Sequence, residues 1–195
     1  MNCKKPVIIA FVAGLALPIF AAAAPATYTL DPDHTHPAFE VDHLGGLSVW
    51  RGNFKKSSGT VVLDKDAKTG TVDVTVDLAS VDMAHDHLSE GMLGPAVFDV
   101  ANYPTAHYTG TLGDFVDGAP TTVTGEMNLH GITKPLNLKI LSFKCMPHPF
   151  FKREVCGADA FGTFNREDFG IHAGKSMGFT MNVTLRIQVE ALINQ

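Results

Sequence analysis

The chain has 195 residues, of which 45% are hydrophobic and 18% are charged, and its formal net charge is -5. This negative balance argues against a nucleic-acid-binding protein. Without Lys4 and Lys5 the net charge becomes -7, which argues equally against electrostatic docking of the whole chain on anionic lipid.

The first residues have the features of an export signal. A positively charged start precedes an apolar run over residues 6–20 and a stretch of alanines. This order predicts a signal peptide over residues 1–24, cleaved between about Ala23 and Ala26. The run is too short to span a bilayer comfortably, and an uncleaved anchor is the alternative.

Removal of the signal leaves residues 25–195, a length that suits one domain with a sizeable core. We expect this domain to be periplasmic. Cys3 precedes the apolar run, so we do not expect a lipoprotein. Cys145 and Cys156 remain, and in an oxidising compartment such a pair predicts one disulfide. A redox-active pair is the less favoured alternative, because the C-x-x-C spacing is absent.

Apolar and polar residues alternate with a period of two through most of the chain, which indicates β-strands with one buried face. In chain order, the predicted strands cover residues 27–31, 38–43, 49–64, 71–78, 105–116, 120–130, 134–145, 155–164 and 182–190. A helical period appears only from about Met83 to Leu93, with Asp82 as a candidate N-cap and Gly91 or Gly94 as its end.

The segment 124–136 has the pattern of a β-hairpin. Met127 and Leu129 share one face, so His130 is expected on the outward face. Pro135 is expected where the next strand begins, because proline cannot donate to a ladder.

These patterns predict an all-β, antiparallel fold with one short helix and a single domain. Long strands and a mature length of about 170 residues favour a closed barrel over a sandwich, since closure removes the exposed sheet edges.

Several sequence segments occur in the order typical of one family. They are Tyr28-Thr-Leu-Asp-Pro-Asp-His-Thr-His36, Phe39-Glu-Val-Asp-His43, His87-Leu88, Phe98-Asp-Val-Ala-Asn-Tyr-Pro-Thr-Ala106, Gly125-Glu-Met-Asn-Leu-His-Gly-Ile-Thr-Lys-Pro135 and Ala158-Asp-Ala-Phe-Gly-Thr-Phe-Asn-Arg-Glu-Asp-Phe-Gly-Ile171. Together they resemble the YceI-like family of exported, lipocalin-like proteins. The resemblance implies an eight-stranded antiparallel lipocalin-like barrel over residues 25–195. It also implies a tunnel for a long apolar molecule such as a polyisoprenoid or a quinone.

The chain departs from the family pattern near the predicted helix. His85-Asp86 stands where many relatives have an arginine–acid pair, and Val97 stands where many have an aromatic residue. The ligand or its route of access is therefore expected to differ here.

The candidate tunnel-lining residues are apolar or aromatic positions with inward-facing periodicity. They are Phe39, Val41, Val74, Val76, Leu78, Phe98, Tyr108, Met127, Leu129, Leu138 and Phe164. Alternation alone does not separate a hollow barrel from a packed one, and the resemblance favours the hollow one.

Two polar residues are candidates for contact with the ligand's head group. Burying an isoprene unit is worth roughly 3–4 kcal/mol relative to water, but almost nothing relative to a bilayer, so head-group contacts near the mouth are needed. His43 and Arg166 are the candidates. The alternative for Arg166 is a structural salt bridge with Glu167 or Asp168.

An alternative function uses the histidine pairs. His34 with His36, and His85 with His87, have His-x-His spacing, which in a strand places both rings on one face. Imidazole suits zinc or copper(II), so this hypothesis is an exported metal-binding protein with a packed barrel. The first hypothesis assigns no metal.

No catalytic motif is found: a G-x-S-x-G elbow, an H-E-x-x-H helix and a phosphate-binding glycine loop are all absent. We therefore expect a binding protein that is not an enzyme and requires no cofactor, with a bound polyisoprenoid or quinone-like lipid as its ligand. A transient contact with a membrane or a membrane redox protein, and a homodimer, are further expectations.

Overall fold

The computed structural model describes residues 24–195, so the predicted signal peptide lies outside the described residues apart from Ala24. The strands are β1 (Ala26–Leu30), β2 (His36–His43), β3 (Ser48–Phe54), β4 (Ser57–Asp64), β5 (Thr69–Asp77), β6 (Val81–Asp82), β7 (Thr105–Gly113), β8 (Thr122–Leu129), β9 (Ile132–Pro135), β10 (Leu138–Pro147), β11 (Glu154–Asn165) and β12 (Asn182–Ile193). The helices are α1 (Asp86–Leu93) and the 3₁₀ helices η1 (Leu78–Ser80), η2 (Arg166–Phe169) and η3 (Lys175–Met177).

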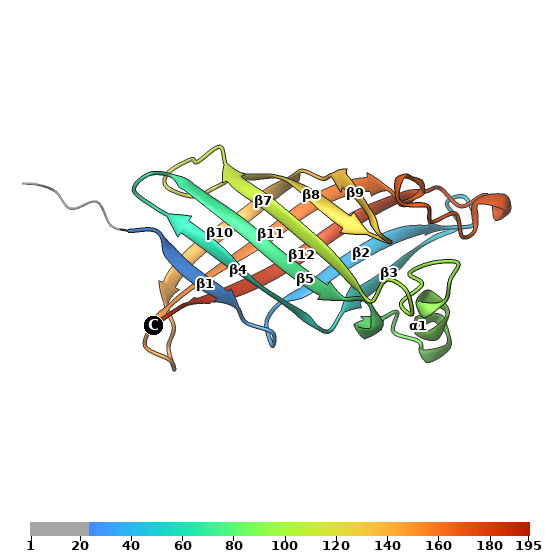
Figure 1. The fold of residues 1–195 in the computed structure, drawn as a ribbon, viewed down its shortest axis with the longest axis horizontal. Coiled ribbons are helices and arrows are strands. Elements are labelled where there is room, and N and C mark those ends of the chain that lie inside the picture. The colour runs from blue at the N-terminus through green and yellow to red at the C-terminus, as the bar shows by residue number, and fades with distance from the viewer. Residues whose placement is uncertain (1–23) are drawn as a thin grey trace, which may run out of the picture.

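The strands form a closed barrel (Figure 1). Antiparallel neighbours run in the order β1, β4, β5, β7, β8, β10, β11 and β12, and β12 pairs with β1 to close the ring. The predicted eight-stranded antiparallel barrel with one short helix is thus confirmed. Since closure pairs the two outermost strands, the ring has no free edge.

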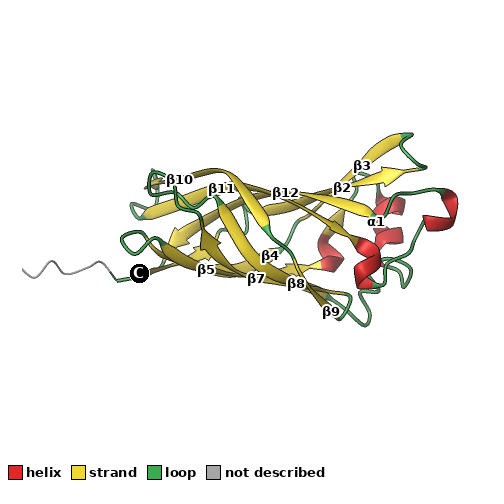
Figure 2. Ribbon diagram, turned by 90° about the horizontal axis from the view of Figure 1, so that it is seen from above, coloured by secondary structure: helices red, strands yellow, loops and turns green. Residues whose placement is uncertain are grey.

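The long strand β12 pairs with β11 along one edge and with two strands in turn along the other. Residues 191–193 pair with β1, whereas residues 183–188 pair with β2. β2 continues to β3, and β3 pairs with β6, so these strands extend the wall beyond the closed ring. The extension lies at the same end of the barrel as α1, as Figures 1 and 2 show.

The barrel therefore has two distinct ends. We call one the helix end, which carries α1, the β2–β3 turn and η3 (Figure 1). We call the other the disulfide end, which carries the C-terminus and the β10–β11 turn (Figure 1). The strands run obliquely between them, as strand tilt in a closed barrel requires.

Three predicted elements have different boundaries in the structure. The predicted strand 134–145 is interrupted at residues 136–137, between β9 and β10. The predicted strand 49–64 is interrupted at residues 55–56, where β3 ends and β4 begins. The helix begins at Asp86, because Asp82 belongs to β6 and its carboxylate accepts from the backbone N–H of Ala84 instead of capping the helix. Gly94 ends the helix as predicted. Among the described residues, no helix combines the length and apolar character needed to cross a membrane.

The hairpin of β8 and β9 is confirmed, but two of its residues differ from prediction. His130 and Gly131 form the turn with φ angles of 55° and 74°, the left-handed geometry that two-residue hairpins favour. His130 is off the cavity wall, as expected, but it is half-buried instead of free in solvent: its Nδ1 lies 3.2 Å from the carbonyl oxygen of Phe169, and its ring lies 4.5 Å from that of Tyr103. Pro135 ends β9 rather than beginning a strand.

Candidate ligand-binding site

A cavity of about 590 Å³ lies in the middle of the barrel. Volumes of about 300–1,000 Å³ are typical of sites that enclose a small organic ligand. Side chains of Val72, Val74 and Val76 on β5 line the cavity, yet they are only half-buried. Inward-pointing residues keep accessible surface only where the interior is not filled, so the barrel is hollow. The packed barrel assumed in the metal-binding hypothesis is wrong.

All thirteen residues expected to contact the ligand lie on the cavity wall. They are Phe39, Val41, His43, Val74, Val76, Leu78, Phe98, Tyr108, Met127, Leu129, Leu138, Phe164 and Arg166. Their contact with a ligand stays a prediction. Tyr108 satisfies its hydroxyl by donating to the carbonyl of Leu136 at 3.0 Å, and burial raises the pKa of Tyr108 to about 12. Its hydroxyl is therefore a neutral part of the wall at physiological pH.

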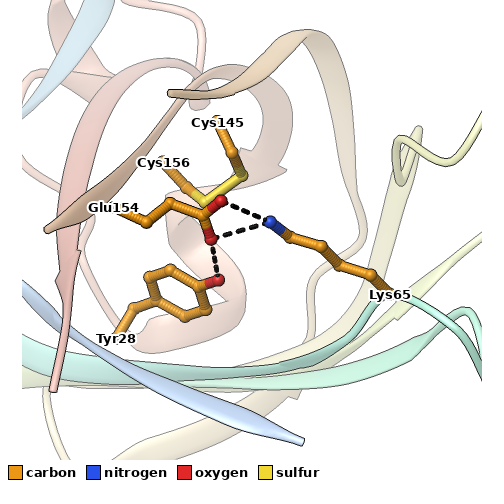
Figure 3. Close-up of a disulfide and its surroundings, with 5 residues drawn as sticks. All are labelled: Tyr28, Lys65, Cys145, Glu154 and Cys156. Atoms are coloured by element: carbon orange, nitrogen blue, oxygen red, sulfur yellow. Dashed lines mark hydrogen bonds and ion pairs between the residues drawn. A yellow bond between two sulfur atoms is a disulfide. The ribbon is translucent and has the colours of Figure 1, made fainter. Parts of the chain in front are cut away.

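The cavity is closed at the disulfide end. Tyr28 and Leu63 line it there and are only 2% and 3% exposed. The hydroxyl of Tyr28 donates to Oε1 of Glu154 at 2.5 Å, and Nζ of Lys65 contacts both carboxylate oxygens at 2.7 and 2.8 Å (Figure 3). These contacts tie β1, the β4–β5 turn and β11 together beside the disulfide.

The ionisation of this cluster follows from its contacts. Burial alone would raise the pKa of Glu154, but the hydrogen bonds from Lys65 and Tyr28 outweigh burial and lower it. Burial, and then the neighbouring carboxylate, raise the pKa of Tyr28 well above its usual range. Glu154 is thus a carboxylate and Tyr28 a neutral donor, which suits a structural plug.

The helix end holds the mouth of the cavity. Leu44 and Met177 line the cavity but are 45% and 61% exposed, so the cavity reaches the surface between the β2–β3 turn and η3. Just inside, the ring of His43 stacks on Trp50 at 4.0 Å and meets the edge of Phe179 at 5.2 Å. Three rings from separate segments therefore form one side of the mouth.

Arg166 is the cation of the cavity wall. Its Nη2 donates to the carbonyl of Ala173 at 2.6 Å, but its Nε is buried and has no partner among the described residues. Burial lowers the pKa of Arg166. The alternative ion pair with Glu167 or Asp168 is not formed, since Glu167 is bound by Lys175 instead. Arg166 thus lines an apolar cavity, while its one unpaired donor, Nε, is packed inside the wall and is not open to the cavity.

The histidine pairs do not form the predicted metal site. His34 lies in the β1–β2 connection, where its Nδ1 is 2.9 Å from Oδ2 of Asp31, and His85 directly precedes α1, which contains His87. Of the four histidines only His36 lies in a strand, as the first residue of β2, so neither pair shares one strand face. Within residues 24–195, the only group with metal-ligand spacing consists of Cys145, Glu154 and Cys156.

The predicted disulfide is confirmed: Cys145 and Cys156 face each other across β10 and β11 and are bonded. Their sulfur atoms are therefore not available as thiolate ligands, and the group around Glu154 does not constitute a metal site.

Sequence reasoning missed Trp50, Phe179 and Met177 as wall residues. Trp50 could have been found, because it lies opposite Val41 in the β2–β3 register and so shares the inward face of Val41. Phe179 and Met177 follow no strand periodicity. Val97, where many relatives have an aromatic residue, also lines the cavity, which leaves more open space beside α1 than an aromatic ring would.

Comparisons with known proteins give one consistent result. A model of the YceI-like domain matches residues 28–191. Protein YceI of Escherichia coli is 30% identical over 174 residues, which cover 88% of this chain and 89% of the relative, and a UPF0312 protein of Pseudomonas putida is 29% identical over 188 residues, covering 94% and 96%.

Solved structures have the same fold. A YCEI protein of Campylobacter jejuni has a TM-score of 0.62 at 24% identity and covers 76% of this chain and 88% of its own. A polyisoprenoid binding domain from Saccharophagus degradans has a TM-score of 0.61 at 17% identity and covers 87% and 99%. With a matching domain model, a hollow barrel and similar relatives along nearly its whole length, the chain belongs to the YceI-like family.

Proposed function

We propose that this protein binds one long, apolar ligand of the polyisoprenoid or quinone class inside the barrel and serves as its exported, periplasmic carrier or scavenger. The observation that carries the proposal is the hollow interior, about 590 Å³ with a largely hydrocarbon wall. A family neighbour described as a polyisoprenoid binding domain supports the same ligand class. The family and this neighbour also favour a binding protein over an enzyme.

The energetics define what the cavity can do. Each buried CH₂ group is worth about 0.8 kcal/mol relative to water, so a chain of a few isoprene units is held firmly against escape into water. Lipid tails are equally apolar, so burial alone does not extract the ligand from a bilayer. The protein therefore needs a polar contact that a bilayer interior does not provide.

Arg166 offers that contact. Its buried Nε lacks an acceptor among the described residues, and an unsatisfied buried donor costs about 1–3 kcal/mol or more for a charged group. A carbonyl or phosphate oxygen on the ligand's head would accept from the guanidinium of Arg166 where it lines the cavity; the Nε itself is reached only if the side chain turns. His43, stacked on Trp50 at the mouth, offers a second polar atom near the same end. We place the head at the mouth and the tail toward Tyr28.

Trp50 provides the test, because it is the chain's single tryptophan and it lines the cavity. The protein is stripped of lipid by extraction in organic solvent and refolded with its disulfide intact. A long-chain ubiquinone is then titrated while tryptophan fluorescence is followed. We expect saturable, stoichiometric quenching at one quinone per chain, and an isoprenoid alcohol without a quinone ring should compete.

Native mass spectrometry of gently purified protein is the second test of ligand binding. We expect an organic adduct of polyisoprenoid mass that is lost after extraction. Absence of any adduct, together with linear and non-saturable quenching by ubiquinone, would refute the proposal. A bound metal without an organic adduct would equally refute it.

Export is tested separately. Osmotic shock of cells that express the full chain should release a protein lacking about the first two dozen residues, with Cys145 and Cys156 oxidised. Retention of the full-length chain in the membrane fraction would instead indicate an uncleaved anchor.

A further inference from the structure

The β10–β11 turn exposes large apolar side chains at the disulfide end. Phe150 is 83% exposed, Phe151 is 58% exposed and Met146 is 44% exposed. We call these three residues the aromatic tip. They take no part in the cavity wall, and exposed apolar groups clustered on one turn are typical of an interaction site.

The turn that bears the aromatic tip is held in one shape. The disulfide joins Cys145 to Cys156 at its base. Within it, Nδ1 of His148 accepts from the backbone N–H groups of Phe150 and Phe151, at 3.2 Å each, and the imidazole stacks on Phe151 at 4.4 Å. The aromatic side chains are therefore presented to solvent by a pre-ordered turn, which lowers the entropy lost when they bind.

Cations surround the aromatic tip. Lys144, Lys152 and Arg153 lie between or beside the cysteines, and residues 144–153 contain no acidic residue. The guanidinium of Arg153 lies 5.8 Å from the ring centroid of Phe151. The adjacent carboxylate of Glu154 is already bound by Lys65. Asp31 is the further acid that interacts with His148 of this turn, and it is paired with His34. The turn itself is thus apolar and cationic on a chain whose net charge is negative.

We propose that the aromatic tip docks the protein on a lipid surface that carries anionic head groups. Phe150 and Phe151 enter the boundary between head groups and acyl chains, where aromatic side chains flanked by Lys and Arg are favoured. The exposed Lys152 then lies at the depth of the phosphates, beside Arg153, whose guanidinium is held by the carbonyl of Ile193. The negative net charge of the chain opposes this weakly, because charges beyond a Debye length of about 8 Å are screened at physiological ionic strength.

Docking through the aromatic tip has a directional consequence. The aromatic tip and the mouth lie at opposite ends of the barrel (Figure 1). A docked protein therefore presents its mouth away from the lipid surface that holds it. The inference concerns the outer surface and does not depend on the cavity being occupied.

Flotation with vesicles tests the inference on the mature, oxidised protein. Vesicles of phosphatidylcholine are compared with vesicles of phosphatidylcholine and phosphatidylglycerol. We expect binding to the anionic vesicles that weakens as salt rises. Phe150→Ser should lower the partition coefficient about tenfold or more, and Lys152→Gln should lower it about fivefold on anionic vesicles only. Leu47→Ser is the matched control, since Leu47 is 72% exposed at the opposite end, and it should bind like the unmodified protein.

A second readout places the side chain in the lipid. Phe150→Trp should gain a blue-shifted emission on anionic vesicles that brominated lipid quenches, over the constant background of Trp50. Three results would overturn the inference. These are no binding to either vesicle, equal loss of binding with Leu47→Ser, or a concentration-dependent dimer that Phe150→Ser abolishes while vesicle binding is unchanged. The last result would assign the aromatic tip to a second copy of the chain.

Discussion

The substitution Ala158→Phe tests whether the barrel is hollow, because the sign of the change in melting temperature differs between an empty and a filled interior. Ala158 lies in β11 opposite Phe143 and Val189, and all three side chains line the cavity. In Ala158→Phe the added ring enters empty apolar space. Full burial of a Phe side chain is worth about 1.5–3 kcal/mol, and a ring that still borders the cavity on one side should gain about 1–2 kcal/mol. At about 2–4 °C per kcal/mol for a domain of this size, the ligand-free variant should melt roughly 2–8 °C higher.

The same substitution should weaken ligand binding. The ring displaces about one isoprene unit, worth roughly 3–4 kcal/mol, so affinity for a long-chain quinone should fall on the order of 100-fold or more. Calorimetry of the lipid-free protein and quinone titration measure the two effects. Thr163→Phe, exposed on the same strand, is the control and should change neither. A lower melting temperature for Ala158→Phe would refute the reasoning, because overpacking a filled core costs about 1–3 kcal/mol.

Three further predictions concern polar and covalent contacts. Arg166→Leu should lower quinone affinity about 10- to 100-fold, as loss of a hydrogen bond from a charged donor does, and should leave the affinity for an isoprenoid hydrocarbon unchanged. Arg186→Leu, at an exposed position, is the control and should change neither affinity. Equal losses of affinity for the two ligands would contradict a head-group contact at Arg166. Lys65→Met should cost about 0.5–1 kcal/mol at neutral pH, since both partners are partly exposed. Because the pKa of Glu154 is lowered on folding, the stability that the Lys65–Glu154 ion pair contributes is present above the unfolded pKa of about 4.3 and is lost as pH falls through the folded pKa. Urea unfolding of the variant and of the unmodified protein should therefore give the same stability in acid. A difference that stays constant with pH would contradict the ion pair. Cys145→Ser should lower the unfolding free energy by roughly 3 kcal/mol for a loop of this length, which is measured as a lower urea midpoint. Added reductant should lower the midpoint of the unmodified protein to the same value and should not change that of the variant.

The strands and the apolar wall were predictable because both follow from a period of two, whereas closure was inferred from chain length and the eight strands from the family resemblance. Inward-facing positions such as Val74 and Met127 alternate with polar residues in any half-buried strand, so the wall could be named before its shape was known. The hollow interior could not be predicted from this pattern, because Val74 alternates in the same way whether its neighbours fill the space or leave it empty. That distinction depends on strand number and tilt, which only the closed ring specifies.

The polar residues were harder to place. Glu167 and Asp168 follow Arg166 in sequence and suggest an ion pair, but η2 directs Arg166 to the wall while Glu167 binds Lys175. His130 broke the alternation because the two-residue turn, with φ of 55°, starts at that residue. Side chains at turns and 3₁₀ helices follow the local backbone geometry, and a strand period contains no information about it.

The plug formed by Tyr28, Glu154 and Lys65 makes the cavity a blind tube with one opening. A ligand in a blind tube must enter tail first and leave head first, and its head meets Arg166 only when the tail has the length of the tube. A longer chain would leave its head protruding from the mouth, and a shorter one would leave its head out of register with Arg166 or a void beside Tyr28. Under the proposed function, the distance from Tyr28 to Arg166 would therefore act as a ruler, and two residues at opposite ends of the barrel would set the chain length of the preferred isoprenoid.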